Sequence, residues 1–198
     1  TDATPETVTN LAENAGFKPV PTGIDHGTVT VVAQGMPHEV TTFRKDVTTD
    51  GRHAVVAYGV TLEDDLARRD FTINAIAYHP LRGEWRDPFG GAADLARGVI
   101  RAVGQPAHRF QEDYLRILRA VRFAARFDFA IDDATWEAAR AASSGLGRLS
   151  AERVRDELVK LLMAPHPRAG LELLCASGLA AHVLPELPAL QLEVDEQH

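Results

Sequence analysis

The sequence contains little cysteine and little lysine. Cys175 is the single cysteine in 198 residues, which excludes an intrachain disulfide and a cysteine-based zinc cluster. Its apolar neighbours favour a buried core thiol over a catalytic one. Lysine occurs three times, so 18 of the 21 basic residues are arginine. The planar guanidinium suits phosphate and base edges, although a genome rich in G and C would also encode arginine in place of lysine.

Long hydrophobic runs are also absent. No stretch approaches the roughly 18 to 20 uninterrupted apolar residues of a membrane helix, and the first residues lack the basic and apolar regions of a signal peptide. We therefore expect a cytoplasmic protein that does not associate with membranes. The composition, 45% hydrophobic and 25% charged, is typical of a packed chain. The length permits one or two domains.

The net charge of −7 argues against a nucleic-acid partner, but this average conceals a local reversal. Between Arg101 and Arg126 lie six arginines, opposed by Glu112 and Asp113 alone, which leaves this segment with a charge of +4. The overall acidity therefore does not exclude a phosphate-containing ligand at this segment.

The first hundred residues predict a mixed α/β region. β-branched residues on both sides of Gln34-Gly35-Met36-Pro37 indicate a hairpin. Thr61, followed three residues later by Asp64, has the form of a capping box that begins a helix. The expected elements are helix 7–15, strands 27–33 and 38–43, a mobile loop 46–53, strand 54–60, helix 61–69, a short helix after residue 91 and strand 99–103.

From about residue 105 onward the pattern indicates helices alone. Apolar residues recur at helical spacing over 112–127, and Ser150 is placed as the N-cap of a helix that continues to residue 163. Gly178 is placed just after the end of another helix. Helices are expected at 112–127, 133–143, 150–163 and 168–177.

The segment Glu112-Asp113-Tyr114-Leu115-Arg116 places an acid and an arginine three residues apart, which on a helix is one face. An acceptor beside a fork-shaped donor matches the edge of adenine or cytosine, which offers an amino group next to a ring nitrogen. Guanine and uracil present the opposite pattern and would leave these groups unpaired. The same spacing is also typical of solvated salt bridges on helix surfaces.

A second segment, Arg68-Arg69-Asp70 followed by Asn74, places two arginines, an acid and an amide close together. Such a polar patch could hold a triphosphate and a ribose hydroxyl. The alternative is that Asp70 is an N-cap and that both arginines are surface charges.

Together these segments resemble the class II tRNA nucleotidyltransferases, which include the bacterial CCA-adding enzymes and poly(A) polymerases. Residues 23–31 and 39–44 are similar to the family's hairpin, 68–75 to its motif B, 87–91 to motif C, 112–122 to motif D and 149–162 to motif E. The resemblance implies an α+β fold: a nucleotidyltransferase-type (polymerase-β-like) mixed-sheet head at 1–104, an all-α neck at 105–164 and the start of a helical body at 165–198.

The resemblance also implies a reaction, the template-independent addition of C and A to tRNA from CTP and ATP with Mg²⁺ and release of pyrophosphate. Asp113 and Arg116 would pair with the base, Glu112 would orient them, and Arg119 and Arg122 would contact the nucleotide. The remaining assignments are Arg69 for the triphosphate, Asp70 and Asn74 for the ribose, Glu39 for catalysis beside the metals, and 46–53 for the loop associated with switching from CTP to ATP.

One departure concerns the family's motif A, a Gly-Gly turn followed by Asp-x-Asp that supplies the metal carboxylates. The sequence contains no Asp-x-Asp, and one carboxylate cannot hold two Mg²⁺ ions. Two alternatives therefore remain beside CCA addition: a poly(A) polymerase, and a noncatalytic module that binds nucleotide or RNA.

Overall fold

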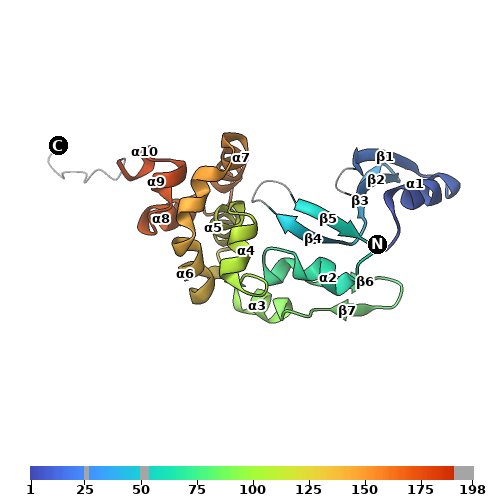
Figure 1. Ribbon diagram of the computed structural model, residues 1–198, viewed down its shortest axis with the longest axis horizontal. Coiled ribbons are helices and arrows are strands. Elements are labelled where there is room, and N and C mark those ends of the chain that lie inside the picture. Colours follow the sequence, from blue (N-terminus) through green and yellow to red (C-terminus); the bar gives the residue numbers. More distant parts are fainter. Residues whose placement is uncertain (25–26, 50–53, 190–198) are drawn as a thin grey trace. The chain divides into compact units, whose positions relative to one another are not determined.

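The computed structural model describes residues 1–24, 27–49 and 54–189, and the chain forms two compact units (Figure 1). The first unit contains the described residues up to Arg69, and the second begins at Asp70. In these described ranges, no helix has the length and apolar character needed to cross a bilayer. Part of the predicted loop 46–53, residues 50–53, lies outside them.

The first unit begins with helix α1 (Pro5–Asn14), whose N-terminus is capped by the hydroxyl of Thr4. A three-stranded antiparallel sheet follows, with strands β1 (Lys18–Gly23), β2 (Thr28–Ala33) and β3 (Met36–Thr41) in that order. The predicted hairpin is confirmed by β2 and β3. Its turn is only Gln34-Gly35, and both residues have positive φ, as a two-residue hairpin turn of this kind requires.

The second part of this unit contains the antiparallel strands β4 (Arg44–Thr49) and β5 (Ala54–Tyr58) and helix α2 (Leu62–Ala67). The capping box at Thr61 and Asp64 is confirmed. The loop prediction is wrong at residues 46–49, because they belong to β4, which pairs with β5. Polarity there indicated a loop, but the β-branched Val47, Thr48 and Thr49 favour a strand.

The second unit combines small strands with a helical bundle. Strands β6 (Ala77–His79) and β7 (Glu84–Arg86) form a hairpin, and β8 (Val99–Ile100) pairs in parallel with β9 (Ala130–Ile131). The helical segments are η2 (Thr72–Asn74), α3 (Gly91–Arg97), α4 (Pro106–Glu112), α5 (Leu115–Phe127), α6 (Asp133–Ala141), η3 (Ser143–Arg148), α7 (Ala151–Leu162), α8 (Pro167–Ala176), α9 (Ala180–Val183) and α10 (Glu186–Ala189).

Helix α5 is the centre of the bundle, because it packs against both α7 and α8. It buries Ile117, Leu118, Val121 and Ala125 along one face, as the spacing predicts. Cys175 is free and packs against this core, but it is half-buried and not fully buried as predicted.

Two predictions for this unit are wrong. The expected helix 112–127 is broken, because Asp113 has extended backbone angles (φ −155°, ψ 104°) between α4 and α5. The segment after residue 105 is also not helical throughout, since β9 adds to β8. The pairing of β9 with β8 and the contact of Asp113 with Arg153 join segments that are distant in sequence, and helical periodicity does not contain that information.

Candidate nucleotide-binding site

Asp70 is the centre of a hydrogen-bond network in the second unit. Its side chain is buried, and Oδ1 accepts from the backbone N–H of Phe71 at 2.8 Å and from Nδ2 of Asn74 at 3.0 Å. Oδ2 accepts from Nε of Arg119 on α5 at 2.7 Å. Three of the predicted nucleotide-binding residues, Asp70, Asn74 and Arg119, therefore lie together although Arg119 is 49 positions along the chain from Asp70.

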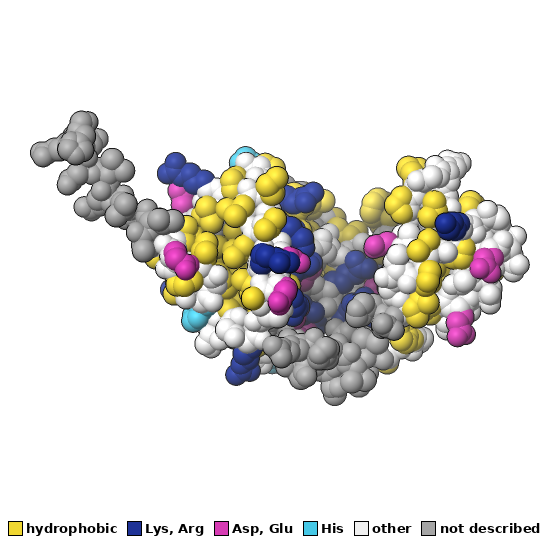
Figure 2. Space-filling model, turned by 90° about the horizontal axis from the view of Figure 1, so that it is seen from above, with side chains coloured by type: hydrophobic (Ala, Val, Ile, Leu, Met, Phe, Trp, Pro, Cys, Tyr) yellow, Lys and Arg dark blue, Asp and Glu magenta, His cyan; other side chains and the backbone are white. Residues whose placement is uncertain are grey.

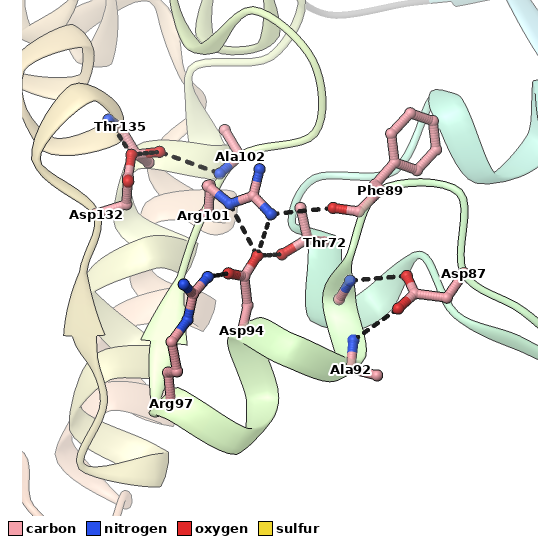
Figure 3. Close-up of polar contacts among 11 residues, drawn as sticks. Thr72, Asp87, Phe89, Ala92, Asp94, Arg97, Arg101, Ala102, Asp132 and Thr135 are labelled. Carbon is pink, nitrogen blue, oxygen red and sulfur yellow. Dashed lines mark hydrogen bonds and ion pairs between the residues drawn. The ribbon is translucent and has the colours of Figure 1, made fainter.

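A second buried carboxylate, Asp94 on α3, supports the turn η2, which follows Asp70 and ends at Asn74 (Figure 3). It accepts from the hydroxyl of Thr72 in η2 at 2.6 Å, from Arg97 at 2.6 Å and from Nε of Arg101 at 2.8 Å. The position of η2 is thus fixed by an ionic cluster beneath it.

The environment of Asp94 also sets its protonation. Burial alone would raise its pKa, but hydrogen bonds from Thr72, Arg101 and Arg97, together with the charge of Arg101, hold the pKa below its ordinary value. The carboxylate is therefore a stable anion within this cluster.

The N-terminus of α3 approaches η2 closely. Asp87 accepts from the backbone N–H groups of Gly91 at 2.7 Å and Ala92 at 2.9 Å (Figure 3). A Cβ at Gly91 would collide with the carbonyl of Thr72. Glycine at position 91 is thus required by the contact between α3 and η2.

Arg116, the predicted donor for the base, is held by the end of α4. Its NH1 atom donates to Oε2 of Glu112 at 2.7 Å and to the carbonyl of Arg109 at 3.0 Å. Oε1 of Glu112 accepts from Arg109 at 2.6 Å. The structure thus brings Glu112 and Arg116 together, which is the contact expected of an orienting acid.

Asp113, the predicted acceptor for the base, lies outside any helix. Its Oδ1 atom accepts from the backbone N–H of Leu115 at 3.1 Å, and Oδ2 accepts from Arg153 on α7 at 2.8 Å. The prediction that Asp113 and Arg116 share one face of a continuous helix is wrong, because α5 begins at Leu115. Asp113 instead lies in the break between α4 and α5, and Arg116 lies in the first turn of α5.

Arg122 is buried in an ion pair with Glu157 on α7, with Nε and Oε2 2.6 Å apart. Its guanidinium also lies over the ring of Phe123, 4.1 Å from the centroid. The structure therefore places Arg122 within the contact between α5 and α7.

In the first unit, Asp65 forms ion pairs with both arginines of motif B, Arg68 and Arg69. Its Oδ1 atom accepts from Arg68 at 2.8 Å, and Oδ2 accepts from Arg69 at 3.2 Å. Burial acts to raise the pKa of Asp65, but Arg68, the backbone N–H of Arg44 and the charge of Arg69 lower it below its ordinary value. Arg69 is thus oriented by a buried acid.

Glu39, the predicted catalytic carboxylate, is exposed on β3 opposite Thr30. Across residues 1–24, 27–49 and 54–189, no three His, Cys, Asp or Glu side chains lie close enough to ligate a metal ion. The described residues therefore do not fit a site for two Mg²⁺ ions.

Sequence reasoning missed the acids and the arginine that hold the predicted residues in place: Asp65, Asp94, Arg153 and Glu157. A signal was present for Asp94, since Arg97 and Arg101 follow it three and seven positions later. Arg153 carried no local signal, because its partner Asp113 is 40 positions away.

The chain matches two protein-family models. Residues 1–101 match the poly(A) polymerase head domain, and residues 128–190 match the probable RNA- and SrmB-binding site of polymerase A. The first segment contains Glu39, Arg69, Asp70 and Asn74, and the predicted site residues on α4, on α5 and between them lie outside both segments.

Individual relatives agree with the family models. A CCA-adding enzyme of Streptococcus pyogenes serotype M5 (strain Manfredo) is 48% identical over 159 residues, which cover 79% of this chain and 39% of the relative. The crystal structure of Bacillus stearothermophilus CCA-adding enzyme in complex with CTP is 40% identical, with a TM-score of 0.84 over 96% of this chain and 46% of that one.

A further solved structure, a tRNA nucleotidyltransferase complexed with a primer tRNA and an incoming ATP analogue, is 28% identical with a TM-score of 0.76. It is matched over 92% of this chain and 52% of its own. The chain thus spans about two fifths to half of the length of these relatives.

Proposed function

Because the chain belongs to the class II tRNA nucleotidyltransferases, we propose that it acts in the addition of C and A to tRNA 3′ ends from CTP and ATP, with release of pyrophosphate. Relatives named CCA-adding enzymes, one of them bound to CTP, support this proposal. We propose tRNA, CTP and ATP as its partners, and the cytoplasm as the place of the reaction.

The observation that carries the proposal is the support of Asp113, in the break between α4 and α5, by Arg153, and of Arg116, in the first turn of α5, by Glu112. A carboxylate and a guanidinium, each held by other residues, supply the acceptor and the donor that match the amino group and ring nitrogen of cytosine and adenine. Uracil and guanine would leave both groups unpaired, which costs about 1–3 kcal/mol for each group.

The other residues receive roles around this pair. Glu112 orients Arg116, and Arg119, joined to Asp70 and Asn74, serves the ribose side. Arg69 is proposed to bind the triphosphate. For Arg122 we propose that its contribution to the nucleotide is made through the position of α5, since Glu157 engages it. We propose that the head extends to residue 104, the neck to 164 and the body from 165.

The metal chemistry needs carboxylates besides those described. We propose that the transfer uses Mg²⁺. Since the described residues do not fit a two-metal site, we assign no step to the metal here. Glu39 is proposed only as an additional carboxylate beside such a site.

The first test is C incorporation. The chain, joined to an upstream strand with the family's Gly-Gly and Asp-x-Asp motif, is incubated with Mg²⁺, CTP alone and a tRNA that lacks its CCA end. We expect extension by C, and extension by A once ATP is added. Incorporation of A alone would indicate the poly(A) polymerase alternative, and tRNA binding without any extension would indicate a noncatalytic module.

A further inference from the structure

We propose that Arg153 is a positioning residue for base selection, which holds the carboxylate of Asp113 in the orientation that accepts a hydrogen bond from the base. The inference rests on the proposed function and extends its site to α7. Neither residue would act alone: Asp113 is the group that contacts the base, and Arg153 acts through it.

The first argument is the local freedom of Asp113. Its backbone is extended and belongs to no helix, so regular structure does not fix the direction of the side chain. Two contacts fix it instead, the Leu115 N–H on Oδ1 at 3.1 Å and Arg153 on Oδ2 at 2.8 Å. The side chain keeps 28% of its surface exposed. A carboxylate has about four lone-pair positions, so acceptor capacity remains for a base amino group.

The second argument is that α7 places Arg153 rigidly. Glu157 lies one helical turn after Arg153 and is buried against Arg122 of α5, with the ion-pairing atoms 2.6 Å apart. Leu161, a further turn along, is buried in the helical core. The residues at spacing i, i+4, i+8 share one face of a helix. The buried ion pair and the core contact therefore set the register that brings Arg153 to Asp113.

The third argument is the matching arrangement on the donor side. Arg116 is supported by Glu112 at 2.7 Å, and Asp113 is supported by Arg153 at 2.8 Å. Each member of the predicted base-reading pair is thus oriented by a side chain of opposite charge. Such supporting contacts are what keeps a recognition pair in a productive geometry.

The alternative is that the Asp113–Arg153 pair only stabilises the fold. Both side chains are partly exposed, at 28% and 37%, and ion pairs of that exposure add little to stability. Removal of Arg153 should therefore leave the thermal melting temperature nearly unchanged. A change in base preference at unchanged melting temperature distinguishes positioning from a structural role.

The experiment compares binding of CTP and UTP to the 198-residue chain by calorimetry. For Arg153→Ala we expect CTP affinity to fall about tenfold, with UTP affinity little changed, the size expected for one misplaced charge-assisted hydrogen bond. Arg153→Lys should retain part of the preference, because it keeps the charge but loses the fork. The matched control is Arg155→Ala on the same helix, which removes an exposed pair with Asp156.

A double variant tests whether Arg153 acts through Asp113. In the Asp113→Ala background, Arg153→Ala should cause no further loss of CTP affinity, since the carboxylate that it positions is absent. Additive losses would overturn the proposal, because Arg153 would then contact the nucleotide itself. An unchanged CTP preference in folded Arg153→Ala would overturn it too. If the unaltered chain shows no preference for CTP over UTP, the proposed base selection is wrong, and the role of Arg153 in it is wrong as well.

Discussion

Arginine satisfies each of the most buried carboxylates in the described residues. Asp65, Asp70, Asp94 and Glu157 all accept from at least one guanidinium at 3.2 Å or less. Arg68 donates both Nε and NH2 to one oxygen of Asp65, which a lysine ammonium cannot reproduce. The arginine surplus in the sequence is therefore partly structural, and it does not by itself measure affinity for phosphate.

The ion pairs of Asp94 lead to a prediction about stability and its pH dependence. Asp94→Asn should lower the free energy of unfolding at pH 7 by about 2 kcal/mol, because a neutral amide leaves Arg97 and Arg101 poorly paired. It should also weaken the pH dependence of stability. The pKa of Asp94 is lowered in the folded state, so its contribution is complete above the unfolded pKa of about 3.9 and is lost as pH falls through the folded value.

Urea unfolding at pH 7 and pH 3 checks this prediction. The unaltered chain should lose more stability between the two pH values than the Asp94→Asn variant does. Asp156→Asn serves as the control, because it lies in an exposed pair with Arg155 on α7. Equal pH dependence in the unaltered chain and in Asp94→Asn would contradict the assigned role.

At the scale of elements, helices and strands with local sequence signals were predicted correctly. Elements whose formation depends on partners distant in the sequence were not. The capping box at Thr61 and the turn at Gln34-Gly35 are local, and both were located. Strand β1 was missed because it contains Pro19 and Pro21, which are tolerated on an edge strand but weaken its pattern.

The same distinction applies to the site. Asp70 and Asn74 were correctly expected to lie together, because they are only four positions apart. The break at Asp113 was not foreseen, since helical spacing of the apolar residues continues on both sides of it. Its side chain bonds the N–H of Leu115 locally, and Arg153 holds it from 40 positions away. Only the first of these contacts could have been read from the sequence.

The packing of α5 against α7 leads to a prediction about stability. Glu157→Ala leaves the buried guanidinium of Arg122 without its carboxylate, so we expect the free energy of unfolding to fall by about 3–5 kcal/mol. Thermal and urea unfolding measure the change. Glu172→Ala on α8 is the control, because its pair with Arg168 is exposed and should contribute little.

At the scale of the whole molecule, the two units differ in how much core the described residues give them. The second unit has a continuous buried cluster that is built from Phe110, helices α5 to α9 and the segment η3. In Figure 2, hydrophobic side chains also gather on the surface of this helical unit. Buried apolar residues of the first unit are fewer, among them Val8, Val29 and Leu66. Hydrophobic burial is the main stabilising term in folding.

We therefore expect residues 70–198 to fold without the first unit. The shortened chain should keep a helical circular-dichroism spectrum and unfold in one cooperative transition, whereas residues 1–69 alone should be less stable. Circular dichroism and urea titration of both pieces measure this. A gradual, noncooperative loss of helix in the 70–198 piece would contradict the prediction.

The contact between Arg116 and the carbonyl of Arg109 has a further consequence. The last turn of α4 leaves carbonyl groups without intrahelical partners, and the negative end of its dipole lies there. Arg116 is thus a C-terminal capping residue for α4 as well as the proposed donor to the base. Replacement of Arg116 would remove the donor to the base and would also fray the end of α4, which carries Glu112. Both effects would weaken nucleotide binding.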